Sequence, residues 1–98
     1  MHLYVIRRRN AWKSPEELQA AAARSKQVGD AEMSADIRWI RSYVVDEGDG
    51  KLGTVCIYQS TSPEAIRAHA ARVGMPADEI TPIAETVVVR PDPVVAAV

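Results

Sequence analysis

Several common signatures are missing from this sequence, and each absence excludes a class of protein. The 98 residues contain one cysteine and no phenylalanine. A single cysteine excludes an intrachain disulfide and is typical of a reducing compartment, so we expect a cytoplasmic protein. No apolar run approaches the roughly 20 residues of a membrane span, and three arginines follow the first apolar stretch, the reverse of a secretory signal. We therefore expect no association with membranes.

Motifs for the commoner binding chemistries are also missing. The chain has no glycine-rich phosphate loop, no Cys-x-x-Cys pair and no nucleophile elbow, which argues against the usual nucleotide-binding and zinc modules. Its net charge is −1, and no helix is basic enough to enter a DNA groove. We therefore expect no nucleic-acid partner.

The sequence does contain alternating strand and helix signals for one domain. Its length leaves room for a single hydrophobic core, which we assign to residues 1–93, with residues 94–98 as an apolar tail. The acidic, glycine-containing segment 46–51 predicts a hairpin turn between two strands. Runs of β-branched and aromatic residues predict strands at residues 3–7, 37–45, 54–59 and 85–89.

Two predicted helices begin with the same three residues. Ser-Pro-Glu occurs at residues 14–16 and again at 62–64, and each copy supplies a serine cap, a proline at the first helical position and an acidic N-terminus. Gly74 followed by Pro76 ends the second helix. The order βαββαβ, nearly repeated in its two halves, predicts a ferredoxin-like split βαβ fold. In that fold both helices cover one face of a four-stranded antiparallel sheet.

Strand alternation predicts which side chains occupy the helix-free face of this sheet. Residues two apart on a strand share a face, and we assign the aliphatic sets, such as Val55 and Ile57, to the alanine-rich helices. An uncovered aromatic surface favours a second subunit or a ligand, so we expect a homodimer through the open face. The residues assigned to that face include Tyr4, Trp39, Arg41, Tyr43, Cys56 and Tyr58.

Several parts of the chain also resemble a known family, from Leu3 to about Ile83. The resemblance rests on the helix opening Ser-Pro-Glu-Glu-Leu, on Trp39 with Ser42-Tyr43-Val44 and Asp46, on Cys56-Ile57-Tyr58, on residues 64–70 and on Gly74-Met75-Pro76-Ala77. The chain is similar to a bacterial family of small ferredoxin-like domains of unknown function, some members of which are described as nickel-binding or nickel-responsive. The resemblance implies this fold, a dimer and a divalent transition metal such as nickel as ligand.

The departures from that family concern the metal. Relatives often carry histidine where this chain has Arg41, and cysteine near Lys26. Imidazole, thiolate and carboxylate groups coordinate nickel, whereas a guanidinium stays protonated and cannot. The metal-ligand candidates left to this chain are His69 and Cys56.

Each candidate residue has a structural alternative. His69, on the inward side of the second helix, is either a metal ligand or general base, or a histidine bonded to a backbone carbonyl. Cys56 is either a thiolate beside Arg41 of the paired strand, or a buried residue that packs as a small hydrophobe. The arginines at residues 7–9 form a solvated rim, unless Arg7 or Arg9 converges with Arg41 on a carboxylate or phosphate.

The leading hypothesis from the sequence is a dimeric small-ligand-binding protein. Its predicted site lies on the open sheet face, at Trp39, Arg41, Tyr43, Cys56 and Tyr58. The alternative is a cofactor-independent enzyme that acts on a small aromatic or polyketide-like substrate, as other small dimeric ferredoxin-like domains do. An interaction module whose aromatic face is consumed by the dimer is a third possibility. The sequence leaves the ligand and any reaction open.

Overall fold

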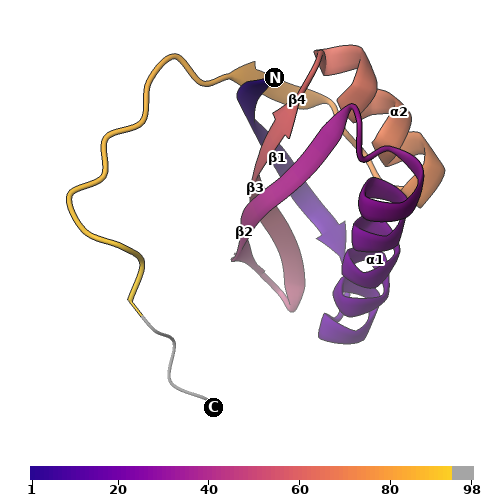
Figure 1. Cartoon of the computed structure of the whole chain (residues 1–98). Helices are drawn as coiled ribbons and strands as arrows, with labels where there is room; N and C mark the ends of the chain where they lie inside the picture. Colours follow the sequence, from indigo (N-terminus) through magenta and orange to yellow (C-terminus); the bar gives the residue numbers. More distant parts are fainter. Residues whose placement is uncertain (94–98) are drawn as a thin grey trace.

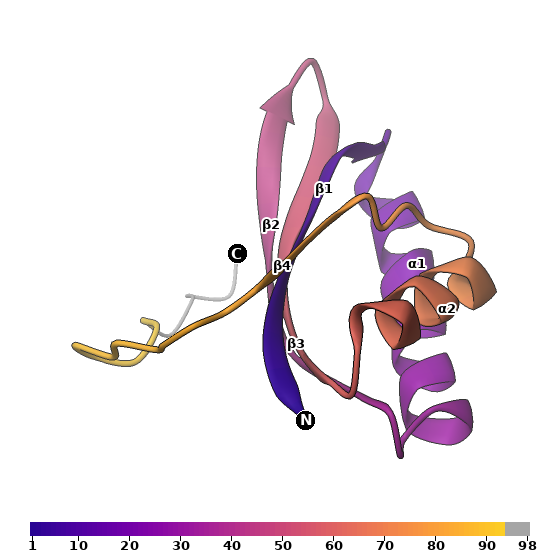
Figure 2. The same ribbon diagram turned by 90° about the horizontal axis from the view of Figure 1, so that it is seen from above.

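An antiparallel sheet and two helices form two layers, with both helices on one face of the sheet (Figures 1 and 2). The computed structural model describes residues 1–93, so the predicted tail at 94–98 lies outside the described residues. The strand order is β2-β3-β1-β4 with antiparallel neighbours, which confirms the ferredoxin-like βαββαβ prediction. The elements are β1 (His2–Trp12), α1 (Pro15–Gln27), the π-helical turn η1 (Val28–Glu32), β2 (Ile37–Gly48), β3 (Lys51–Ser60), α2 (Pro63–Val73) and β4 (Glu79–Pro82).

The predicted helix starts are confirmed by their hydrogen bonds. The hydroxyl of Ser14 accepts a hydrogen bond from the backbone N–H of Glu17 at 3.2 Å, and the hydroxyl of Ser62 accepts one from Ala65 at 3.1 Å. Gly74 ends α2 with a φ of 88°, a left-handed conformation that glycine adopts without strain. Neither helix of the described chain is long and apolar enough to cross a membrane.

The fourth strand lies earlier in the chain than the predicted 85–89. β4 pairs with Tyr4–Arg7 of β1, so residues that closely follow α2 take this edge of the sheet. Pro82 made a strand at this position hard to predict, because proline has no backbone N–H to donate. Proline is tolerated on an edge strand, where one side of the strand has no neighbour to bond. The β-branched segment predicted as a strand instead leaves the domain on the side opposite the helices (Figure 2).

The aromatic residues of the central strands face the helices. Tyr4, Cys56 and Tyr58 are buried in one core cluster with Ile66 of α2, so placing them on the helix-free face was wrong. Alanine-rich helices bring little volume to the layer between helix and sheet. The larger rings from the sheet fill that volume, because protein interiors pack closely.

A bulge in β2 breaks the alternation that the sequence pattern assumed. Trp39 pairs with Tyr58, but Arg41 pairs with the neighbouring residue of β3, which leaves Ile40 as an extra residue. Trp39 therefore faces the helices, while Arg41 and Tyr43 face the open side. The prediction that these three side chains share a face was wrong, because one inserted residue reverses the alternation beyond it.

Candidate ligand-binding cavity

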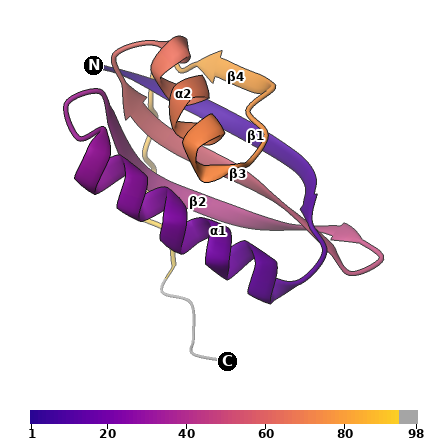
Figure 3. The same ribbon diagram turned by 90° about the vertical axis from the view of Figure 1, so that its right-hand side faces the viewer.

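A cavity of about 550 Å³ lies between α1 and the sheet. Helix α1 runs along the β2 side of the sheet (Figure 3), and the exposed residues Gln19 of α1 and Val44 of β2 form the rim of the cavity. Its apolar wall includes both tryptophans of the chain, Trp12 and Trp39, together with Ala22 of α1. Size and apolar walls of this kind are typical of small-molecule sites.

Polar side chains from three strands and α1 complete the lining of the cavity. Three ligand contacts predicted from the sequence line this cavity: Trp39, Cys56 and Tyr58. They lie under the helices and not on the open face. Ser25 comes from α1. The polar residues of the lining are Arg8, Gln19, Ser25, Arg41, Ser42, Thr54, Cys56 and Tyr58, of which Gln19 and Arg41 are exposed at the rim.

A chain of hydrogen bonds connects one wall of the cavity to Cys56. The indole Nε1 of Trp39 donates to Ser42 Oγ at 2.7 Å, and that hydroxyl donates to Cys56 Sγ at 2.9 Å. Arg8 Nη1 donates to the same sulfur at 3.4 Å. The cation beside the thiol is therefore Arg8, whereas the sequence had suggested Arg41.

Tyr58 forms the back of the cavity. Its ring stacks on Trp39 with a centroid separation of 6.2 Å, and it forms a T-shaped pair with His69 at a centroid separation of 5.6 Å. Its hydroxyl lies 3.0 Å from Ser25 Oγ. Burial raises the pKa of Tyr58 above its ordinary value of 10.0, so the phenol stays neutral near neutral pH and acts as a hydrogen-bonding group.

His69 lies behind this wall and is not among the residues that line the cavity. It is 1% exposed, and its Nε2 donates to the backbone carbonyl of Ser25 at 2.9 Å, because a carbonyl can only accept. Burial lowers the pKa of His69 from its ordinary value, and the charges of Arg8 and Arg72 act in the same direction. This geometry matches the structural alternative, a neutral histidine bonded to a carbonyl.

The three consecutive arginines of β1 point in different directions. Arg7 and Arg9 pair with acidic residues of β2 and β4, each at 2.8 Å, so neither converges with Arg41. Arg8 is 2% exposed and lines the cavity, so the prediction of a solvated rim was wrong for this residue. Alternation along β1 contained the signal, because Arg8 shares a face with Tyr4 and Ile6.

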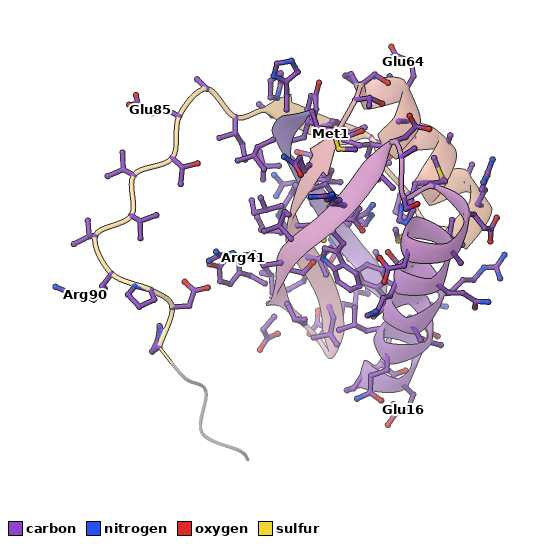
Figure 4. The ribbon with its side chains drawn as sticks, viewed as in Figure 1. Met1, Glu16, Arg41, Glu64, Glu85 and Arg90 are labelled. Atoms are coloured by element: carbon purple, nitrogen blue, oxygen red, sulfur yellow. The ribbon has the colours of Figure 1, made fainter. Side chains whose placement is uncertain are left out.

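Arg41 and Tyr43 form a separate group on the open face. Both contact one carboxylate oxygen of Asp92, from Arg41 Nη1 at 3.0 Å and from the Tyr43 hydroxyl at 2.7 Å. Figure 4 shows Arg41 extending from β2 toward the C-terminal segment. Arg41 also reaches the rim of the cavity, but Tyr43 does not line it. The five predicted ligand contacts thus divide between two faces of the sheet.

The buried state of His69 predicts a pH dependence of stability. The folded protein keeps His69 neutral, while the unfolded chain takes up a proton near the ordinary pKa of 6.5. The stability that the neutral His69 contributes to the fold is therefore fully present above pH 6.5. It is lost as the pH falls below 6.5 toward the lowered pKa of the folded state. Urea unfolding between pH 7.5 and 5 should show the free energy of unfolding fall, by at most about 1.4 kcal/mol per pH unit.

Two variants isolate the histidine responsible. His69→Gln should flatten the slope in this window, whereas the same change at the exposed His2 should leave it unaltered. Hydrogen bonds from Arg7 and Arg9 lower the pKa values of Glu47 and Glu79 below 4.5. Titration of these two carboxylates therefore changes the stability only below the pH range of this experiment. An unchanged slope in His69→Gln would contradict the assignment.

Comparison with known proteins confirms the resemblance seen in the sequence. The family model described as nickel responsive protein SCO4226-like matches residues 4–83. The chain is also similar to the crystal structure of SCO4226 from Streptomyces coelicolor A3(2), with a TM-score of 0.69 and 19% identity over 87% of this chain and 99% of that one. No curated protein matches the chain. This chain belongs to the SCO4226-like family of nickel-responsive proteins.

Proposed function

We propose that this protein binds a small organic ligand in the cavity between α1 and the sheet. The observation that carries the proposal is the coincidence of a ligand-sized, largely apolar cavity with buried polar side chains from several elements. Four of the five ligand contacts predicted from the sequence line this cavity: Trp39, Cys56 and Tyr58 under the helices, and Arg41 at the rim. Most of the remaining wall is apolar, which favours a ligand with a flat or aliphatic body.

The proton-transfer candidates favour binding over catalysis. His69 is not among the residues lining the cavity, and its Nε2 is occupied by the Ser25 carbonyl. The hydroxyl of Tyr58 is engaged by the Ser25 side chain, and its raised pKa makes it a poor base. No aspartate, glutamate or histidine of the described residues lines the cavity. We therefore propose a binding protein ahead of a cofactor-independent enzyme.

The residues present do not fit a nickel site formed by His69 and Cys56. No group of three or more histidine, cysteine, aspartate or glutamate side chains within residues 1–93 is placed to hold a metal ion. The sulfur of Cys56 accepts a hydrogen bond from the guanidinium of Arg8, and that positive charge opposes a divalent cation at the same atom. The nickel in the family description is therefore not assigned to these two residues.

Nickel titration of the purified protein tests this exclusion. His69→Gln and Cys56→Ser should each change the nickel affinity of the protein by no more than about twofold. Loss of a residue that coordinates the metal would lower the affinity far more than this. Isothermal titration calorimetry measures the affinity, and circular dichroism checks that each variant is folded. If a folded variant loses nickel binding, the residue that was changed is a nickel ligand and the exclusion is wrong.

Filling the cavity tests the binding proposal itself. Ala22→Phe places a ring into the cavity from α1, whereas Ala23→Phe places the same ring on the exposed side of the helix. We expect 2-naphthamide, a neutral probe with a flat apolar body, to bind the wild-type protein and Ala23→Phe but not Ala22→Phe. Calorimetry reports the affinity. Chemical shifts of the Trp12 and Trp39 indole protons report the place, because both rings line the cavity.

Equal binding to Ala22→Phe and Ala23→Phe would place the probe elsewhere on the molecule. Absence of binding to the wild-type protein, at probe concentrations up to its solubility, would count against a cavity ligand of this kind. Overpacking is destabilising, so thermal unfolding should first confirm that Ala22→Phe is folded at the temperature of the titration.

We also propose that a second copy of the chain covers the open face of the sheet. Beside Arg41 and Tyr43, this face carries four half-buried aliphatic side chains of β1 and β3: Leu3, Val5, Val55 and Ile57. Val87, Val88 and Val89 are 83%, 72% and 82% exposed, and a hollow of about 750 Å³ lies between their segment and the face. Adjacent apolar surfaces of this kind support association with a matching surface.

Sedimentation velocity tests the proposed dimer. We expect the wild-type protein to sediment as a dimer and Ile57→Arg, which places a charge in the centre of the open face, as a monomer. Ala20→Arg adds the same charge at an exposed position of α1 and should remain dimeric. A wild-type monomer at high protein concentration, or a dimeric Ile57→Arg variant, would refute this interface.

A further inference from the structure

The guanidinium of Arg8 is buried and has no counter-ion within residues 1–93. Its Nε donates to the backbone carbonyl of Pro76 at 2.7 Å, and Nη1 donates to Cys56 Sγ at 3.4 Å, a weak acceptor. Nη2 has no hydrogen-bond partner among residues 1–93. None of the ion pairs within the described chain includes Arg8. A buried cation normally has a carboxylate partner, and this one has none there.

A second buried side chain without a hydrogen-bond partner within residues 1–93 belongs to the residue that pairs with Arg8 in the sheet. Thr54 is the register partner of Arg8 across β1 and β3, and it is 3% exposed. Its hydroxyl oxygen has no partner within the described residues. Both side chains line the same cavity. Two register-paired residues at the wall of one ligand-sized space thus each keep a buried donor without a partner within residues 1–93.

The fold alone does not account for this arrangement. A buried polar group without a partner destabilises the folded state, and native proteins rarely keep such groups without a reason. Arg9, the next residue along β1, shows the ordinary solution, since it is exposed and paired with Glu79. Arg8 and Thr54 lack that compensation, which is the pattern expected where a ligand supplies the missing acceptor atoms.

We propose that the cavity binds a small aromatic carboxylate, whose carboxylate accepts hydrogen bonds from Arg8 Nη2 and the Thr54 hydroxyl. This inference rests on the proposed function and names its ligand class. A guanidinium presents donors in a planar array that suits a carboxylate. Because no acidic side chain of the described residues lines the cavity, nothing there competes with the anion for these donors.

The rest of the cavity suits the body of such a ligand. Trp12, Trp39 and Leu18 supply flat or aliphatic walls, against which an aromatic ring packs. Trp39 is held in place by its stacking on Tyr58 and by its hydrogen bond to Ser42. A fixed wall limits the ordering that binding requires. The ligand is thus anionic at one end and apolar at the other.

Calorimetric titration with a matched pair of probes tests this inference. The probes 2-naphthoate and 2-naphthamide share one ring system and differ in charge. We expect the wild-type protein to bind the acid about tenfold or more tightly than the amide, as a charge-assisted hydrogen bond in a buried site requires. Inorganic phosphate, which lacks the apolar body, should bind at least about tenfold more weakly than 2-naphthoate.

Variants of the two donors assign the effect. Arg8→Met should bring acid and amide to similar affinities and should raise the melting temperature, because it removes an uncompensated buried charge. Arg9→Met, the neighbouring control, should keep the preference for the acid. Thr54→Val replaces the hydroxyl with a methyl group of similar size and should weaken binding of the acid several-fold while leaving binding of the amide unchanged. This variant carries the test if Arg8→Met does not fold.

The outcomes separate this inference from the proposed function. Binding of the amide and the acid with equal affinity by the wild-type protein would leave a cavity ligand intact and overturn the carboxylate. Failure of both probes would overturn both proposals. A preference for the acid that persists in Arg8→Met and Thr54→Val, or phosphate binding as tight as that of 2-naphthoate, would place the anion elsewhere and refute the assignment.

Discussion

The packing of Tyr58 connects the sheet to both helices, and the cavity depends on it. Its ring lies between Trp39 of β2 and His69 of α2, and its hydroxyl meets Ser25 of α1. A buried aromatic pair contributes about 0.5–1.5 kcal/mol beyond the burial of its area. This one side chain therefore contacts a neighbouring strand and both helices. The space that remains beside it, under the small residues of α1, is the cavity.

The buried polar groups of this layer serve two different purposes. Ser25, Tyr58 and His69 form a network in which each side chain has a partner, and such a network fixes the packing of helices on sheet. Arg8, Thr54 and the Nδ1 atom of His69 keep polar atoms without partners within the described chain, and of these three residues Arg8 and Thr54 line the cavity. Destabilising groups that persist in a folded protein are often functional.

The organisation of the chain could be predicted because its signals are local. Ser14 and Ser62 cap their helices through hydrogen bonds to residues three positions later, and Gly74 needs only its own backbone freedom. The candidate site was predicted in part. Trp39, Cys56 and Tyr58 were correctly grouped, but on the wrong face, and Arg8 was set aside as a surface charge. Alternation could have placed Arg8 beside Tyr4, had the inward face been assigned correctly.

The sequence by itself determined the order of elements, the helix boundaries, the hairpin and the family, because capping, turn formation and motif spacing act over a few residues. The tertiary structure decided which face of the sheet the helices cover. That choice depends on fitting large rings against small helical residues, and on one extra residue, Ile40, that reverses the alternation of β2. It also decided the environment of Arg8. Alternation puts Arg8 on the same face of β1 as Tyr4, but only packing decides that the helices cover that face.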